Sequence, residues 1–253
     1  MSTCNILSAQ NINISFDGRQ ILKDVSITLN EGEIVSLLGV SGSGKTTLFN
    51  ILSGIYIPDS GAVFLRDKNI TGRPGEISYM LQKDLLFPYR KVIDNVCLPL
   101  ILNGVSKKEA REKANPLFAT FGLEGTQFQY PSQLSGGMRQ RCALLRTYLS
   151  SNGVALLDEP FSALDTITKS TIHKWYLEVM QEINLSTVFI THDIDEAILL
   201  SDRIYILTLD ETGVGVIENE ISIDVPKPRD DNFNLTEEFL QYKRQIVQIL
   251  HLS

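Results

Sequence analysis

The sequence predicts an α/β protein whose central sheet is mostly parallel. Short apolar runs that read as strands alternate with segments of helical periodicity, which is typical of a parallel sheet covered by helices. The runs at 34–38, 154–157 and 187–191 are almost continuously apolar, as expected for strands buried on both faces. The 253 residues suit one domain with a subdomain, and a hydrophobic content of 43% can bury a substantial core.

The first 90 residues are rich in strand signals. Residues 5–30 alternate apolar and polar side chains on both sides of a turn at Asp17-Gly18, which predicts two strands of an antiparallel edge sheet. The further elements expected in this part are a strand at 34–38, a helix from Thr46 closed by Gly54, a turn at 58–61, and strands at 62–66 and 77–81.

Helical patterns replace the strands between 92 and 146. Ser106 and Glu109 form a capping box that predicts a helix running to about Phe121, with Gly122 and Gly125 at its end. The elements expected afterwards are a strand at 154–157, a helix at 167–183, a strand at 187–191, a short helix around Glu196, a strand at 203–209 and an amphipathic helix at 235–250. We therefore expect one domain over 1–253, with a strand-rich core (about 1–90 and 152–225), a helical subdomain (about 91–151) and a C-terminal tail (about 226–253).

Composition narrows the class of protein. The net charge of −7 and the pI of about 5.1 argue against a nucleic-acid partner, because such proteins normally carry a basic surface. The three cysteines are isolated and indicate neither a disulfide framework nor a zinc site. The N-terminus lacks the pattern of a secretory signal, and no segment has the roughly 18 apolar residues of a membrane helix. Any membrane role is therefore expected from the surface.

The segment GVSGSGKT matches the phosphate-binding pattern G-x-x-x-x-G-K-[ST] between a predicted strand and a predicted helix. Its glycines allow backbone N–H groups to turn towards a phosphate, and the helix N-terminus adds positive potential. Lys45 would reach the terminal phosphates of the ligand, and the Thr46 hydroxyl would bind Mg²⁺. The expected ATP-binding residues of this loop are Gly39, Val40, Ser41, Gly42, Ser43, Gly44, Lys45, Thr46 and Thr47. A P-loop NTPase (RecA-like) core follows from this context.

Two acids follow the predicted strand at 154–157. Asp158 would hold Mg²⁺, and Glu159 would act as general base towards the attacking water. Two acids at a strand end are common on protein surfaces, but the matched phosphate loop favours the catalytic interpretation. His192 follows the next strand, so it should reach the same sheet edge, where such sheets bind ligands. A lone histidine is more often structural.

In this order, the motifs resemble those of ATP-binding cassette (ABC) ATPases over nearly the whole chain. They are the phosphate loop at 39–46, LSGGM at 134–138, LLDEP at 156–160, SALD at 162–165 and the triplet Thr191-His192-Asp193. The resemblance implies that Phe16 stacks on adenine and that Gln82 contacts Mg²⁺ and the attacking water. It also implies that Asp165 contacts a partner subunit and that His192 contacts the γ-phosphate. Met138 stands where many members of the family have glutamine.

The same resemblance gives the LSGG segment a role in another subunit's site. In these ATPases two cassettes pair head to tail, and this segment of one closes over the ATP of the other. Ser135, Gly136 and Gly137 would lie at a helix N-terminus suited to an anion. Arg139 and Arg141 are assigned to packing and surface contacts.

Three classes of cassette stay open from the residues. The first is the ATPase subunit of a membrane importer. The second is a soluble ABC ATPase acting on DNA or the ribosome, which usually needs two cassettes or a long insertion in one chain. The third is a nucleotide switch with little turnover, which would be expected to lack a catalytic group, whereas Glu159 and His192 are both present. These observations favour the importer subunit.

Two further segments are similar to those of importers of the nitrate, sulfonate and taurine type, whose members also carry thiamine precursors. They are the segments 82–96 and 225–231. In the first segment, Phe87, Pro88 and Tyr89 are either an ordinary exposed loop or a docking surface. The resemblance implies a second copy of the chain, a membrane permease that docks on the first segment, and an extracytoplasmic solute-binding protein. It implies a location at the cytoplasmic face of the membrane. It leaves the solute and the role of the C-terminal helix undetermined.

Overall fold

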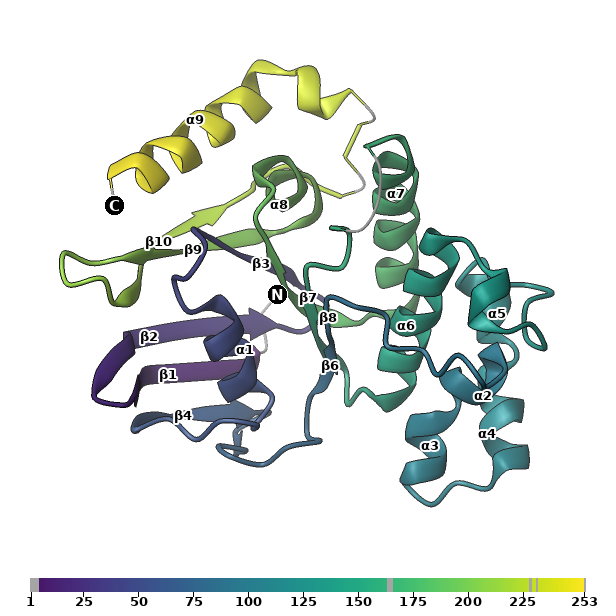
Figure 1. The fold of residues 1–253 in the computed structure, drawn as a ribbon. Coiled ribbons are helices and arrows are strands. Elements are labelled where there is room, and N and C mark those ends of the chain that lie inside the picture. The colour runs from purple at the N-terminus through teal and green to yellow at the C-terminus, as the bar shows by residue number, and fades with distance from the viewer. Residues whose placement is uncertain (1–4, 163–165, 228, 231, 253) are drawn as a thin grey trace.

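The computed structural model describes residues 5–162, 166–227, 229–230 and 232–252 (Figure 1). The strands are β1 (Asn5–Phe16), β2 (Arg19–Asn30), β3 (Ile34–Gly39), β4 (Ser60–Leu65), β5 (Lys68–Asn69), β6 (Ser78–Met80), β7 (Val154–Asp158), β8 (Ser186–Thr191), β9 (Arg203–Leu209) and β10 (Gly215–Ser222). The α-helices are α1 (Lys45–Leu52), α2 (Val92–Val96), α3 (Leu98–Leu102), α4 (Lys107–Ala114), α5 (Leu117–Thr120), α6 (Gly136–Ser150), α7 (Thr166–Ile183), α8 (Ile194–Leu200) and α9 (Glu237–Leu252).

These strands form one sheet in the order β5-β4-β1-β2-β10-β9-β3-β8-β7-β6. The pairs from β9 to β6 are parallel, and the pairs among β5, β4, β1 and β2 are antiparallel. The prediction of a mostly parallel α/β core with an antiparallel part is therefore confirmed. Parallel pairing brings the carboxyl ends of β3, β7 and β8 to one edge, where ligands bind in such sheets.

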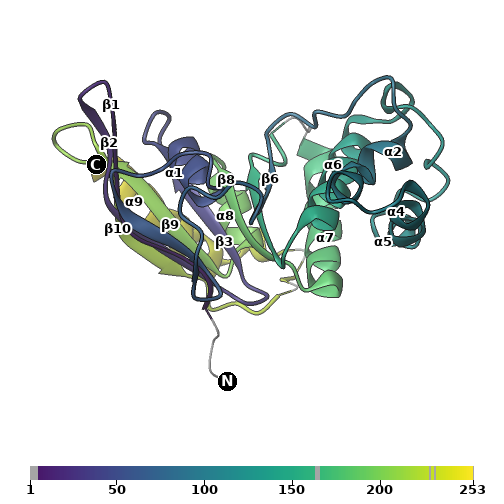
Figure 2. The same ribbon diagram turned by 90° about the horizontal axis from the view of Figure 1, so that it is seen from below.

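Helix α1 packs inside the bend of the curled sheet. Figure 2 shows it between the β1–β2 hairpin and β8. Its buried side chains Leu48 and Phe49 share a core with residues of both parts of the sheet, such as Leu22 of β2 and Ile190 of β8. Because both flanks of α1 are packed, the position of α1 is fixed, and so is the end of the loop that leads into it.

Helices α2 to α6 stand together at one side of the sheet, next to α7 (Figure 1). A core that includes Phe118, Phe121 and Leu145 joins them to α7 and to β7. The single helix expected from Ser106 to about Phe121 is wrong, because α4 ends at Ala114 and α5 begins at Leu117. Pro116 lacks the amide proton that an uninterrupted helix would need there, and its ring obstructs the preceding turn. The capping box at Ser106 is present, with its hydroxyl accepting from the Glu109 amide at 3.3 Å.

The C-terminal part contains a strand that the sequence analysis did not assign. This strand, β10, pairs antiparallel with β9 and links it to β2 through the pair Gly215–Leu22. Helix α9 then packs on α8 and β9. Its side chains Phe239 and Ile246 are buried in this contact. Within the described residues, no helix has the length and apolar character needed to cross a membrane.

Candidate functional site

The phosphate-loop sequence connects the end of β3 to the start of α1. Gly44 caps α1 with a φ of 99°, and Gly42 has a φ of 80°, both in the region that favours glycine. A Cβ on Gly39 would collide with the carbonyl oxygen of Leu207 in β9, whereas a Cβ on Gly42 would meet no atom within 4 Å. Gly39 is therefore required for packing, and Gly42 borders open space that can admit a phosphate.

Lys45 folds back over this loop. Its ammonium group donates to the carbonyl oxygens of Gly39 (2.9 Å) and Val40 (2.7 Å). Burial lowers the pKa of Lys45, and the negative charges of Glu159 and Asp158 oppose that shift. A half-buried cation beside inward-facing glycines suits a phosphate group. Ser43 supports the loop by donating to the Val40 carbonyl at 2.9 Å, while Ser41 is exposed.

Asp158 ends β7 and receives a hydrogen bond of 3.3 Å from the hydroxyl of Tyr79 in β6. Burial raises the pKa of Asp158, and the neighbouring charge of Glu159 raises it further. A divalent cation at this carboxylate would relieve both effects. The described residues contain no group of three or more His, Cys, Asp or Glu side chains that could hold a metal. The sequence analysis proposes oxygen ligands for Mg²⁺ from Thr46, Gln82 and Asp158, and such ligands together with phosphates fit the usual chemistry of Mg²⁺ with nucleotides.

Glu159 lies between two other predicted site residues. Its Oε2 accepts from Gln82 Nε2 at 2.8 Å, and its Oε1 lies 3.3 Å from His192 Nδ1. The backbone of Glu159 has a φ of 46°, and its amide donates to the Ile190 carbonyl at 3.1 Å. A positive φ costs free energy for a non-glycine residue, and a tertiary hydrogen bond holds it here. The structure thus brings Gln82, Glu159 and His192 together.

Phe16 lies at the end of β1 with 41% of its surface exposed. Its ring packs edge-to-face on Tyr56, with 5.4 Å between the centroids. Thr46 and Thr47 lie in the first turn of α1, exposed and half-buried respectively. An exposed aromatic face at the end of a strand can accept a planar base.

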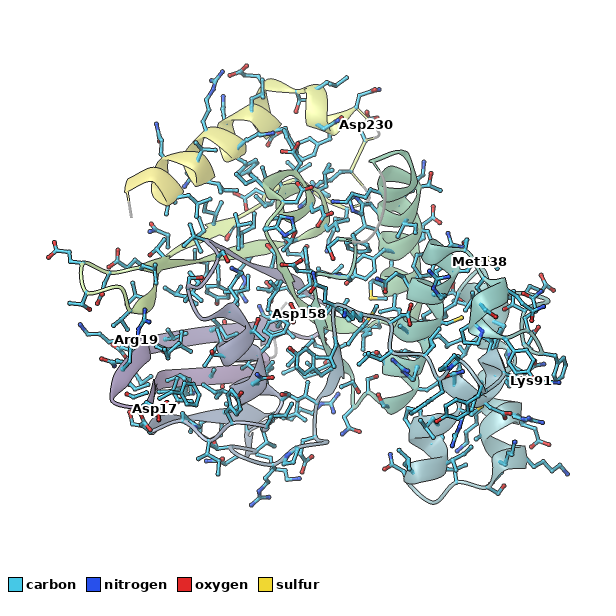
Figure 3. The ribbon with its side chains drawn as sticks, viewed as in Figure 1. Asp17, Arg19, Lys91, Met138, Asp158 and Asp230 are labelled. Carbon is cyan, nitrogen blue, oxygen red and sulfur yellow. The ribbon has the colours of Figure 1, made fainter. Side chains whose placement is uncertain are left out.

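Ser135 to Gly137 do not join the phosphate loop of their own chain. Ser135 caps α6, accepting from the Met138 amide at 3.3 Å, and both Ser135 and Gly136 are exposed. Figure 3 shows Asp158 near the centre of the molecule and Met138 well to one side, at the start of α6. In this view the capped helix N-terminus therefore lies apart from Asp158 of its own chain. Asp165 lies outside the described residues.

Comparisons with known proteins show which family this chain resembles. The family model described as "ABC transporter" matches residues 22–162. The chain belongs to the ABC transporter family. It is 37% identical to the formylaminopyrimidine import ATP-binding protein of Halalkalibacterium halodurans, covering 97% of this chain and 96% of that one. It is 34% identical to the nitrate import ATP-binding protein of a Synechocystis species, covering 96% and 94% of the two chains.

The fold of this ABC cassette also matches a solved structure with a bound product. That structure is a dimeric ATP-binding cassette in a post-hydrolysis state with ADP and phosphate; it is 29% identical, with a TM-score of 0.71 and coverage of 87% of this chain and 100% of that one. Family membership, the phosphate loop and this neighbour together show that the chain is an ABC-type ATPase.

Two arginines of α6 bind the segment that follows Gln82: Arg146, which the sequence analysis did not single out, and Arg139, which it assigned to packing and surface contacts. Arg146 of α6 donates to the carbonyl oxygens of Asp84 (2.6 Å) and Leu85 (2.9 Å). Arg139 binds the Asp84 carboxylate at 3.3 Å and the Leu134 carbonyl at 2.8 Å. The segment after Gln82 is thereby tied to α6. Arg139 and Arg146 are two helical turns apart and so share one face of α6, which is the signal that could have found them.

Proposed function

We propose that this chain is the ATP-hydrolysing subunit of a membrane importer and works as a head-to-tail dimer with two ATP molecules between its subunits. The observation that carries the proposal is the contact of Gln82 and His192 with Glu159. These are the side chains proposed to act on the attacking water and the γ-phosphate. The import names of relatives that match almost the whole chain support the transport role.

The proposed roles follow the positions of the side chains. Lys45 and the loop amides hold the phosphates, while Thr46, Asp158 and Gln82 hold Mg²⁺, which would neutralise phosphate charge when bound. Glu159 accepts a proton from the attacking water, and Gln82 and His192 orient the carboxylate and the terminal phosphate. Phe16 stacks on the base.

The second half of each site comes from the other subunit in this proposal. Ser135 exposes a capped helix N-terminus, which favours an anion. The start of α6 lies well to one side of Asp158 in Figure 3, so we propose a partner's nucleotide as the ligand of this segment. Asp165 would contact the partner subunit.

The loop at 87–91 is the proposed docking surface for the permease. Buried Asn95 shapes it, accepting from the Phe87 amide at 2.6 Å and donating to the carbonyl oxygens of Phe87 (3.2 Å) and Arg90 (3.1 Å). This leaves Tyr89 70% exposed, with its ring 5.7 Å from that of Phe87. A rigid loop that presents aromatic rings to solvent is typical of a protein interface. The loop follows Gln82, so a docked permease would sense changes at the site.

The names of the relatives guide the proposals for solute and location. The relatives are named for formylaminopyrimidine and nitrate import, so we propose a small anionic or pyrimidine-type solute, delivered by an extracytoplasmic solute-binding protein. The chain would lie at the cytoplasmic face of the membrane.

We also propose that the core (about 1–90 and 152–225) and the helical part (about 91–151) shift relative to each other during the cycle, with the tail (about 226–253) attached to the core.

A test of docking uses a candidate permease subunit that is co-expressed with this chain. Changing Phe87 and Tyr89 together to Ala should preserve ATP binding and weaken co-purification with that permease and its stimulation of ATP hydrolysis. Leu235→Ala, at a residue 76% exposed on the tail, is the matched control and should change neither. If the double variant binds the permease normally, docking lies elsewhere. If the unaltered chain hydrolyses ATP but no permease binds or stimulates it, the importer role is wrong.

A further inference from the structure

The seven-residue helix α8 directly follows Thr191-His192-Asp193 and is held at both of its ends by other parts of the chain. In Figure 1 it lies below α9, and α7 stands beside it. His192 itself is 63% exposed at its side chain, so few contacts of its own fix the imidazole. Its position beside Glu159 therefore depends on how the backbone on both sides of it is held.

Lys169 of α7 holds the N-terminal end of α8. Its ammonium lies 2.7 Å from Glu196 Oε1 and 3.3 Å from Asp193 Oδ2. Glu196 Oε2 accepts a hydrogen bond of 2.7 Å from the Thr191 hydroxyl, which in turn accepts from the Asp193 amide at 3.0 Å. The residues immediately before and after His192 are thus joined to one buried carboxylate.

That carboxylate depends on charged neighbours. Glu196 is 4% exposed, and its Oε1 accepts no well-angled hydrogen bond although Lys169 lies 2.7 Å away. This contact is therefore an ion pair. His173 Nε2 also lies near Glu196 Oε1, at 3.6 Å. Removing the Lys169 charge would leave a buried carboxylate without its main counter-ion, which destabilises its surroundings.

Arg229 holds the other end of α8. Its guanidinium donates to the carbonyl oxygens of Ile198 (2.6 Å), Leu199 (2.8 Å) and Ser201 (2.7 Å). The last carbonyls of a helix have no partner within the helix and carry partial negative charge, so a planar cation with several donors satisfies them well. Arg229 belongs to the 225–231 segment, which the sequence analysis noted without giving it a task.

Other residues of the tail also contact α8. Phe233, Phe239 and Ile246 pack in one cluster with Ala197 and Ile198 of α8. In addition, Lys243 of α9 lies 2.6 Å from Asp195 in the first turn of α8. The tail therefore touches α8 along its length and at both ends.

We propose that Arg229 and Lys169 are positioning residues, which fix the two ends of α8 and thereby hold His192 against Glu159. The proposal rests on the catalytic role proposed above for His192. It assigns the tail a part in ATP hydrolysis although no tail residue contacts the reacting groups.

The first experiment changes Arg229→Gln in the purified chain. We expect kcat to fall by about ten-fold or more with KM for ATP little changed, because a misplacement of about 1 Å can cost about 10²-fold in rate. Arg229→Lys should retain part of the rate, since one ammonium can satisfy some of the carbonyls. Arg244→Gln is the matched control, because Arg244 lies in the same tail but pairs with Glu237 at the surface, and it should leave kcat unchanged.

A second experiment separates positioning from general loss of structure. Arg229→Gln and Lys169→Met are each combined with His192→Ala, and single-turnover phosphate release is measured. If the two residues act through His192, neither adds a further loss in the His192→Ala background. If the losses multiply, or if Arg229→Gln leaves kcat unchanged, the proposal is wrong. Lys169→Arg should restore the rate lost in Lys169→Met.

The two levels of inference fail in different ways. If His192→Ala alone leaves hydrolysis unchanged, the catalytic role of His192 is wrong. If His192→Ala lowers kcat but Arg229→Gln and Lys169→Met match the Arg244→Gln control, the proposed function stands and the positioning role is overturned. Thermal melting of each variant identifies any that fail to fold. If Arg229→Gln or Lys169→Met fails to fold, Arg229→Lys or Lys169→Arg respectively replaces it in the combination with His192→Ala. Multiplied losses again overturn the proposal.

Discussion

His192 Nδ1 lies 3.3 Å from Oε1 of Glu159, while the second carboxylate oxygen of Glu159 accepts a hydrogen bond from Gln82. The two residues follow neighbouring parallel strands, β8 and β7, in which Asp158 pairs with Ile190. The carboxylate is thus bracketed by an imidazole and an amide at the edge of the sheet. This relationship makes Glu159 the residue whose replacement should affect hydrolysis most specifically.

Glu159→Gln should preserve ATP binding and lower turnover by about 10²–10⁴-fold, because the amide keeps the shape of the side chain but cannot accept the proton. Steady-state hydrolysis and nucleotide titration measure the two effects, and size-exclusion chromatography should show an ATP-bound dimer. Glu218→Gln, at an exposed residue of β10, is the control. Near-normal hydrolysis by the Glu159 variant would remove that residue from its role.

Asp158→Asn should raise the melting temperature of the nucleotide-free protein at pH 7 and weaken Mg²⁺-dependent ATP binding. Burial raises the pKa of Asp158 in the folded state, so its ionised form costs stability above the unfolded pKa, and the amide removes that cost. Calorimetric melting at pH 7 checks the sign. Asp210 gives the opposite case: hydrogen bonds from Thr212 and the Val214 amide lower its pKa, so Asp210→Asn should lower the melting temperature. A lower melting temperature for Asp158→Asn would contradict the account.

Ser135→Arg tests the head-to-tail arrangement in a mixed dimer with one altered subunit. The bulky side chain should disable the site on the opposite subunit, because the exposed cap of α6 is proposed to close over the partner's nucleotide. Combining it with Lys45→Ala decides which site is lost. With both changes in one subunit each site is damaged, whereas with one change in each subunit one site stays intact. If the first arrangement is the more active, the head-to-tail model is wrong.

Glu196→Gln should lower the free energy of unfolding at neutral pH by roughly 3 kcal/mol, with the loss shrinking in acid. Burial alone would raise the pKa of Glu196, but the nearby His173 and Lys169 and the hydrogen bond from Thr191 outweigh it and lower the pKa to about 2. A depressed acid stabilises the fold above its unfolded pKa of 4.5, and that stabilisation disappears as pH falls towards 2. Urea unfolding of both proteins at pH 7, 5 and 3 measures the difference. A difference that is constant down to pH 3 would contradict the prediction.

The fold class was predictable because its signals are local. Apolar runs, the phosphate-loop pattern and the capping box at Ser106 each depend on neighbouring residues, and the confirmed sheet follows from them. Errors arose where a local signal was weak or was overruled. The pattern around Ala114 is helical, yet Pro116 divides it, and the alternation in β10 is too irregular to indicate a strand until β9 lies beside it.

The sequence by itself determined the family, the order of the strands and helices around the site, and the candidate residues at 39–47, 158–159 and 192, because these depend on residue type and spacing. The tertiary structure decided which side chains meet. It placed Gln82 on Glu159, Lys169 on Glu196 and Arg229 on the end of α8, and it put the start of α6 to one side of Asp158 in its own chain. Contacts between distant segments depend on how helices pack on the sheet, and no spacing along one chain encodes that geometry.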